Sequence, residues 1–121
     1  MVNDNTRTGL RAEVRLFEQC ESYTQHEPGL ASFRWILKQG EIPEVCMGLV
    51  SLEGPIHKTP GVHQEWDQVY LVFSGSGMVH LDNQSQRLTG PSAVIIPAGT
   101  RHSIELQRGE KIEYVYVNKW R

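Results

Sequence analysis

The sequence predicts an all-β domain that folds as a sandwich or a barrel. From residue 32 onward, short stretches rich in Val, Ile, Tyr, Phe and Trp alternate with clusters of Gly, Pro, Asn and Ser, which is typical of strands joined by turns. No interval between these stretches has a 3.6-residue apolar period, so the chain offers no place for crossover helices. We therefore expect mostly antiparallel strands in a sheet that hides its edges.

The breaker residues place seven strands in order. They are expected at 32–38, 44–52, 68–74, 77–82, 92–97, 102–107 and 110–119. The run Gly75-Ser76-Gly77 lies between two of them and is expected to form a tight hairpin. A length of 121 residues predicts one domain, which we divide into an N-terminal arm or edge strand at 1–30 and a barrel at 31–121.

Residues 10–16 alternate apolar and charged side chains, which favours a half-buried strand. Leu10, Val14 and Phe17 also fit one face of a short helix. A strand here would either cap its own sheet or pair with the edge of a second copy, and the sequence leaves both open. We expect a homodimer.

Composition excludes several partners. Twelve Lys plus Arg against fourteen Asp plus Glu give a net charge of -2 without runs of one sign, so nucleic acid is not an expected partner. The longest apolar runs are about five residues and the start of the chain is polar, so neither a membrane span nor a secretory signal is expected. Cys20 and Cys46 lack the spacing of a metal knuckle, and we expect reduced thiols in the cytoplasm.

Two segments place histidines among turn-forming residues. Pro97, Gly99 and His102 have the spacing Pro-x-Gly-x-x-His, and an earlier segment has His63, four residues, Gln68, six residues and a glycine. In order and spacing these segments resemble the two motifs of the cupin superfamily, small barrels also called double-stranded β-helices or jelly rolls. The resemblance spans about residues 45–118 and implies a single-domain cupin jelly roll.

The match is incomplete at three positions. Gly61 stands where the family pattern has a first histidine, Gln68 where it has Glu, and Leu106 where it has Asn. With a slip of one residue, His63 takes the first histidine position and Glu65 the second. Both alignments stay open at the level of sequence.

The resemblance implies a divalent transition metal, Fe, Mn, Ni or Zn. Such an ion needs three or four ligands at about 2.0–2.2 Å from one point, so side chains distant in sequence must converge. The candidate ligands are His63, Gln68, His102 and, as a fourth, His57, although each is also compatible with a structural role. Gln68 would ligate only through a neutral amide oxygen, and Glu65 is the leading candidate for an anionic ligand.

Tyr70 follows Gln68 by two residues, so both lie on one face of a strand. We take Tyr70 and Glu65 as candidate catalytic residues, Tyr70 as an acid or a substrate contact; the alternative for Tyr70 is an aromatic core residue with a satisfied hydroxyl.

Two functions follow from this sequence. The first is a metal-dependent enzyme acting on a small organic acid, sugar or secondary metabolite, as a dioxygenase, an isomerase or cyclase, or a decarboxylase. The second is a non-catalytic binding or sensor cupin with a degenerate or absent metal site, which the three departures from the motifs favour.

Overall fold

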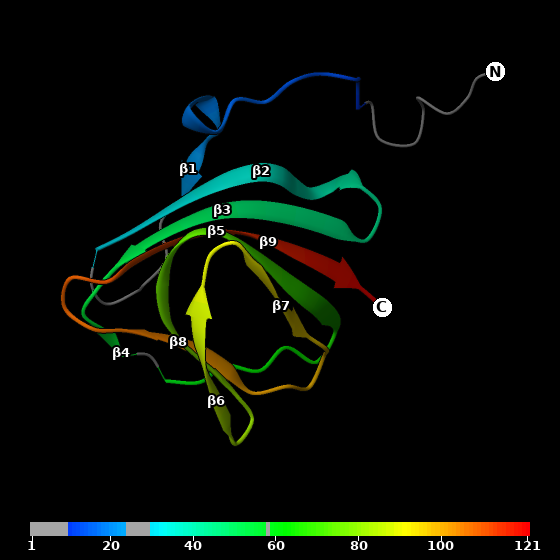
Figure 1. Ribbon diagram of the computed structural model, residues 1–121. Helices are drawn as coiled ribbons and strands as arrows, with labels where there is room; N and C mark the ends of the chain where they lie inside the picture. Colours follow the sequence, from blue (N-terminus) through cyan, green and yellow to red (C-terminus); the bar gives the residue numbers. More distant parts are fainter. Residues whose placement is uncertain (1–9, 24–29, 58) are drawn as a thin grey trace.

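A computed structural model describes residues 10–23, 30–57 and 59–121, and these residues form a curled antiparallel sheet (Figure 1). A 3-10 helix, Phe17–Gln19, precedes the sheet. The strands are β1 (Ser22–Tyr23), β2 (Leu30–Ile42), β3 (Val45–Glu53), β4 (Ile56–His57), β5 (Trp66–Leu81), β6 (Gln84–Thr89), β7 (Ser92–Ile96), β8 (His102–Leu106) and β9 (Lys111–Trp120). Their order in the sheet is β1-β2-β3-β9-β5-β8-β4, with β6 and β7 also paired to β5. The predicted all-β class and antiparallel pairing are confirmed.

Strand β5 joins the two halves of the barrel. Its first part pairs with β9 and β7, and its second part, from residue 76, pairs with β6 and β8. The strand bends at Gly75, which has a φ of +92° and whose missing side chain lets the backbone of Lys111 approach. The predicted hairpin at Gly75-Ser76-Gly77 is therefore wrong, because the glycines mark a bend within one continuous strand.

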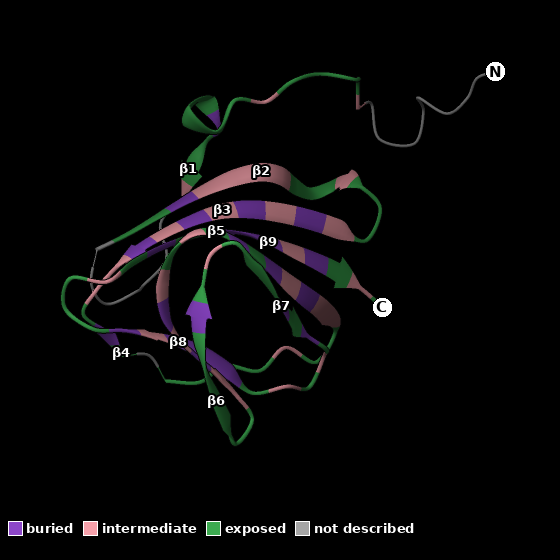
Figure 2. Cartoon of the chain, viewed as in Figure 1, coloured by how far each residue is buried: buried purple, intermediate pink, exposed green. Residues whose placement is uncertain are grey.

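The interior of the barrel follows from strand alternation. Along β3, buried and half-buried residues alternate without interruption, so Cys46, Val50 and Leu52 point inward. Buried positions also alternate along much of β5, and along β9 except at Val115, which is buried between Tyr114 and Tyr116 (Figure 2). The largest fully buried side chains belong to one core cluster; they are Ile56, Ile96, Leu106, Ile112, Val50 and Val72.

The sequence did not reveal strands β4 and β6. Strand β6 is polar at most positions and buries only Leu88, so it has no apolar alternation to recognise. Strand β4 is two residues long and lies in a segment with turn-forming Pro and Gly. Both strands pair with elements that were predicted, β4 with β8 and β6 with β5.

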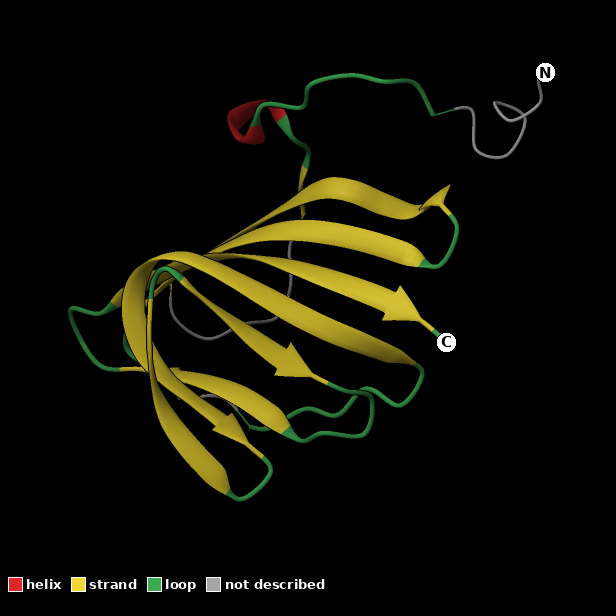
Figure 3. Ribbon diagram, turned by 45° about the vertical axis from the view of Figure 1, so that its right-hand side comes forward, coloured by secondary structure: helices red, strands yellow, loops and turns green. Residues whose placement is uncertain are grey.

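The strand predicted at residues 10–16 is wrong. The structure gives this segment neither strand nor helix, and it passes outside the barrel above β2 (Figure 3). Val14 is 85% exposed and Leu16 is 50% exposed, so the apolar side chains at these two positions are not buried as a half-buried strand would require. Arg15 attaches the segment to β2 by donating to the carbonyl of Ile36 and to the carboxylate of Glu41. The 3-10 helix has three residues, and no helix in the described part of the chain is long and apolar enough to cross a membrane.

Candidate functional site

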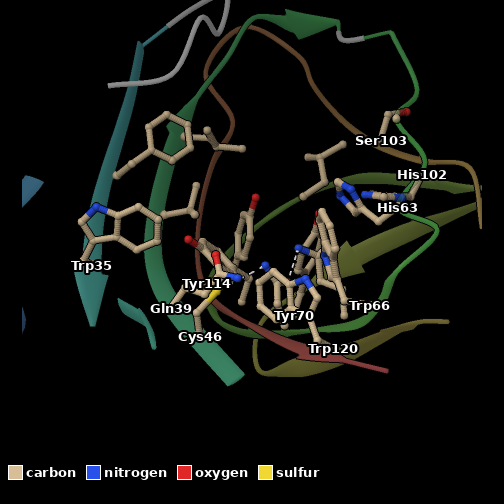
Figure 4. Close-up of a pocket in the computed structure, with 18 of the residues that line it drawn as sticks. Trp35, Gln39, Cys46, His63, Trp66, Tyr70, His102, Ser103, Tyr114 and Trp120 are labelled. Carbon is tan, nitrogen blue, oxygen red and sulfur yellow. Dashed lines mark hydrogen bonds between the residues drawn. The ribbon is translucent and has the colours of Figure 1, made fainter. Parts of the chain in front are cut away.

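The barrel holds a cavity of about 420 Å³ with an aromatic wall (Figure 4). Seven of the ten Phe, Trp and Tyr residues of the chain line it, including all three tryptophans. They are Phe33, Trp35, Trp66, Tyr70, Tyr114, Tyr116 and Trp120. The volume falls in the range of about 300–1,000 Å³ that is usual for small-molecule sites.

Two neighbouring strands supply the floor of the cavity. Gln68 on β5 lies opposite Asn118 on β9, and Tyr70 lies opposite Tyr116. Because side chains two residues apart share a face, these four groups project to the same side of the sheet. Gly48 on β3 pairs with Tyr116, and a Cβ atom on Gly48 would lie 2.4 Å from the Tyr116 ring. The glycine therefore makes room for that ring against the sheet.

Backbone hydrogen bonds bring the two histidine segments together. Gly61 and His102 exchange a pair of hydrogen bonds, each 2.9 Å long, and the amide of Gly99 donates to the carbonyl of His63 over 2.7 Å. As a result the rings of His63 and His102 lie with their centroids 4.8 Å apart in the cavity wall (Figure 4). The two segments that resemble cupin motifs thus meet through main-chain contacts.

The ring of His102 has a defined tautomer in its neutral form. Its Nδ1 lies 3.0 Å from the carbonyl oxygen of Thr100, and because a carbonyl only accepts, Nδ1 carries the proton. Nε2 is then the acceptor of the ring. His63 stacks on Trp66 with the ring centroids 4.4 Å apart, and Tyr70 meets His102 edge-on at 6.5 Å.

The structure brings four of the predicted site residues to the cavity, namely His63, Gln68, Tyr70 and His102. It does not bring Glu65 or His57 there. Glu65 is exposed at the surface. The side chain of His57 is 86% exposed, and its Nδ1 lies 3.2 Å from Glu105 Oε2 on the outside of the barrel.

The polar groups of the cavity form a short buried chain. Gln68 Nε2 donates to Asn118 Oδ1 over 2.8 Å, and Asn118 Nδ2 donates to Cys46 Sγ over 3.6 Å. Burial raises the pKa of the Cys46 thiol, so the thiol stays protonated. Burial and a 2.9 Å hydrogen bond with Tyr23 raise the pKa of Tyr116 well above its usual range.

The donor set of this cavity does not fit a resident divalent transition metal. Within residues 10–23, 30–57 and 59–121, no three or more His, Cys, Asp or Glu side chains form a group that could hold a metal ion. The cavity offers the imidazoles of His63 and His102, the neutral amides of Gln68 and Asn118 and the buried thiol of Cys46, with no carboxylate to balance the charge of the ion. The nearby carboxylate of Asp67 accepts instead from the Ala98 amide and from Arg121.

Sequence reasoning missed the contribution of β9 to the site. Tyr114, Tyr116, Asn118 and Trp120 all line the cavity at a spacing of two residues. That alternation was visible in the sequence, but the pairing of β9 with β5, which aims it at Gln68, was not. Phe33 was missed for the same reason, as an inward position of a strand whose neighbours were unknown. Trp35 and Trp66 were compatible with a cavity mouth in the sequence, although ordinary packing was favoured, and both line the cavity.

Comparisons with known proteins define the fold. No protein-family model matches the chain, and no curated protein matches it by sequence. Among solved structures, the chain is similar to the polyketide cyclase RemF from Streptomyces resistomycificus, with 17% identity, a TM-score of 0.78 and coverage of 90% of this chain and 80% of that one. It is also similar to a predicted oxalate decarboxylase from Thermotoga maritima, with 14% identity, a TM-score of 0.81 and coverage of 90% and 100%.

A third similar structure is a sugar phosphate isomerase of a cupin superfamily from Silicibacter pomeroyi, with 17% identity, a TM-score of 0.71 and coverage of 86% and 73%. Together the sheet and these neighbours define a jelly-roll barrel. The fold is that of the cupin superfamily, as the two motifs indicated.

Proposed function

We propose that this protein is a small-molecule-binding cupin whose cavity takes a cyclic, largely apolar organic ligand. The observation that carries the proposal is the aromatic wall, in which seven ring side chains surround about 420 Å³. The ring centroids of Tyr70 and Tyr114 lie 4.5 Å apart, and those of Trp66 and Trp120 lie 5.0 Å apart. The aromatic rings therefore pack close together around the cavity. Such walls bind flat ligands through apolar burial and ring stacking.

The structural neighbours support a ligand of this size. They include a polyketide cyclase, a predicted oxalate decarboxylase and a sugar phosphate isomerase, all named for chemistry on small molecules. Of these three types of compound, the wall of this cavity suits a ring-containing one best, because its aromatic groups would stack on a ring and contribute little to a small dianion.

Binding is tested with phenylnaphthylamine, an uncharged dye that becomes fluorescent in apolar surroundings. We expect saturable dye binding, with energy transfer from the tryptophans because all three line the cavity. Tyr70→Leu removes a ring from the cavity, whereas Phe73→Leu removes a ring from the outer face of the same strand, where Phe73 is 46% exposed. The proposal requires Tyr70→Leu to weaken dye binding several-fold more than Phe73→Leu does; equal affinities in both variants would refute it.

A second candidate function is an enzyme that uses proton transfer at the same site. Its support is the fixed tautomer of His102, whose Nε2 would accept a proton from a bound ligand, with Tyr70 as the neighbouring acid. Once a ligand is identified, mass spectrometry of the ligand after incubation distinguishes the two functions. Conversion of the ligand that is lost in His102→Ala, with ligand binding retained, would establish the enzyme. Recovery of the unchanged ligand would instead support a non-catalytic binding protein.

Three finer predictions belong with this proposal. A bound Fe, Mn, Ni or Zn ion would find His63, His102, Gln68 and Cys46 in the cavity but no carboxylate, so we expect weak metal binding. A homodimer remains expected, and the exposed apolar side chains of Leu71 and Ile95 on the outer face of the sheet support it. A cytoplasmic location is a prediction from the sequence.

A further inference from the structure

Two buried polar atoms of cavity-lining residues have no hydrogen-bond partner in the described part of the chain. They are the side-chain oxygen Oε1 of Gln68 and the indole nitrogen Nε1 of Trp66. Gln68 is only 7% exposed, and both residues line the cavity. An acceptor or donor that is buried without a partner destabilises the fold, so such atoms are expected to have a partner from outside the chain.

The orientation of the Gln68 amide is set by its neighbour. Its Nε2 donates to Asn118 Oδ1, while Asn118 uses its own nitrogen to donate to Cys46 Sγ. The chain of donors therefore runs in one direction and leaves the Gln68 oxygen as an acceptor. Trp66 Nε1 can only donate. Trp66 and Gln68 are two residues apart on β5 and both line the cavity. Their side chains, one carrying the free acceptor and the other the free donor, therefore project from the same side of one strand.

The cavity wall also selects against charge. None of the described residues that line it is Asp, Glu, Lys or Arg. A buried anion would find no Lys or Arg counter-ion among these lining residues and would lose its hydration without that compensation.

We infer that the ligand is an uncharged hydroxyl-bearing aromatic compound, a neutral phenol or its fused-ring equivalent. Its hydroxyl group donates to Gln68 Oε1 and accepts from Trp66 Nε1, and its ring packs against the aromatic wall. A hydroxyl suits this pair of atoms because it is both a donor and an acceptor. This inference rests on the proposed function, since it names the ligand class for the same cavity.

Four ligands of nearly equal shape test the inference: naphthol, methoxynaphthalene, methylnaphthalene and naphthoate, all substituted at the same ring position. Affinities are measured by NMR titration at about pH 8, where naphthol is neutral and naphthoate is an anion. We expect naphthol to bind about tenfold more tightly than methylnaphthalene, since two net hydrogen bonds of about 0.5–1.5 kcal/mol each correspond to roughly that ratio or more. Methoxynaphthalene cannot donate to Gln68 and should fall between them, and naphthoate should bind most weakly.

Two variants locate the effect. Gln68→Leu should reduce the preference for naphthol over methylnaphthalene several-fold without weakening methylnaphthalene, and Trp66→Phe should do the same while keeping a ring. In the free protein the indole N–H signal that disappears in Trp66→Phe belongs to Trp66, and it should move downfield when naphthol binds. The ligand series itself needs no substitution, so it stands even where a variant fails to fold.

The outcomes separate this inference from the proposed function. Binding of methylnaphthalene and naphthol with equal affinity, or tighter binding of naphthoate, overturns the inference and leaves the aromatic cavity as a binding site. Failure of all four compounds to bind overturns the proposed function, and the inference with it. A preference for naphthol that persists unchanged in both variants also overturns the inference, because the hydroxyl would then be recognised elsewhere.

Discussion

His63 and His102 come from separate segments of the chain, yet their rings lie with centroids 4.8 Å apart. Their approach depends on main-chain contacts, since Gly61 pairs with His102 and Gly99 donates to the His63 carbonyl. The main chain at these positions therefore sets the geometry of the site together with the histidines. Two imidazoles at this separation can bind an organic ligand or a metal ion. Which of the two they bind depends on the other donor groups of the cavity.

The metal content of the purified protein tests whether the cavity holds a metal ion. With imidazoles, neutral amides and a buried thiol as donors but no carboxylate, we expect protein purified without a metal-chelating tag, and then incubated with Fe, Mn, Ni or Zn, to retain well under one equivalent after dialysis. Elemental analysis measures it. One equivalent of metal that disappears in His102→Ala but not in His57→Ala would show that the cavity holds a metal after all.

A substitution at Gly48 tests the packing of the cavity floor. In Gly48→Ala the new Cβ would meet the Tyr116 ring at 2.4 Å, so the ring must move. We expect a loss of about 1–3 kcal/mol in the free energy of unfolding, as for other overpacked sites, together with weaker dye binding. Gly61→Ala is the matched control, because nothing lies within 4 Å of the place that its new Cβ would take. Equal losses in the two variants would contradict the packing described for Tyr116.

The contacts of Glu105 on the outer side of the barrel predict that the stability of the protein depends on pH. Its carboxylate accepts from His80 Nε2 over 2.8 Å, and this contact, with a smaller contribution from His57, lowers the pKa of Glu105. The folded state thus binds a proton less readily than the unfolded state, so the contribution is present above the ordinary carboxyl pKa of about 4.5 and is lost as the pH falls below it.

Urea unfolding of the wild type and of Glu105→Gln, each at about pH 7 and about pH 4, measures this contribution. We expect the variant to lose stability at the higher pH and to differ less from the wild type at the lower pH. Glu65→Gln, at an exposed carboxylate, should leave both values unchanged. A difference between wild type and Glu105→Gln that is the same at both pH values would contradict the prediction.

The outer face of the sheet predicts where two copies would meet. Leu71, Phe73 and Ile95 project from β5 and β7 and are 47%, 46% and 61% exposed. We expect light scattering to give a mass near twice 13.8 kDa, and Phe73→Lys or Ile95→Lys to shift it toward the monomer. Val14→Lys, on the N-terminal segment, is the control variant for these substitutions. Dissociation by Val14→Lys alone would place the contact on that segment instead.

Much of the fold was predictable because its signals are local. Apolar stretches bounded by turn-forming residues located β3 and β9, and the spacing of Pro97, Gly99 and His102 identified the second motif. The convergence of His63 and His102 was predicted from the resemblance alone. Local signals failed at Gly75, because a glycine with positive φ serves a hairpin and a bend within a strand equally well.

The rest of the site depends on pairing between distant strands. Asn118 belongs to no motif and becomes part of the cavity only because β9 pairs with β5 in a register that sets it opposite Gln68. Glu65 alternates correctly with His63 in the sequence, but that segment is not a strand, so the two-residue rule did not apply to it. Register and irregular backbone are properties of the whole sheet and were invisible to single-sequence patterns.

A crystal structure of the protein soaked with a brominated naphthol tests the central claim most directly, because the anomalous signal of bromine locates the ligand independently of its shape. We predict one strong bromine peak inside the barrel, among the aromatic side chains, with the hydroxyl oxygen within hydrogen-bond distance of the side chain of Gln68. Bromine peaks confined to the outer surface, with only solvent among those aromatic side chains, would contradict the account.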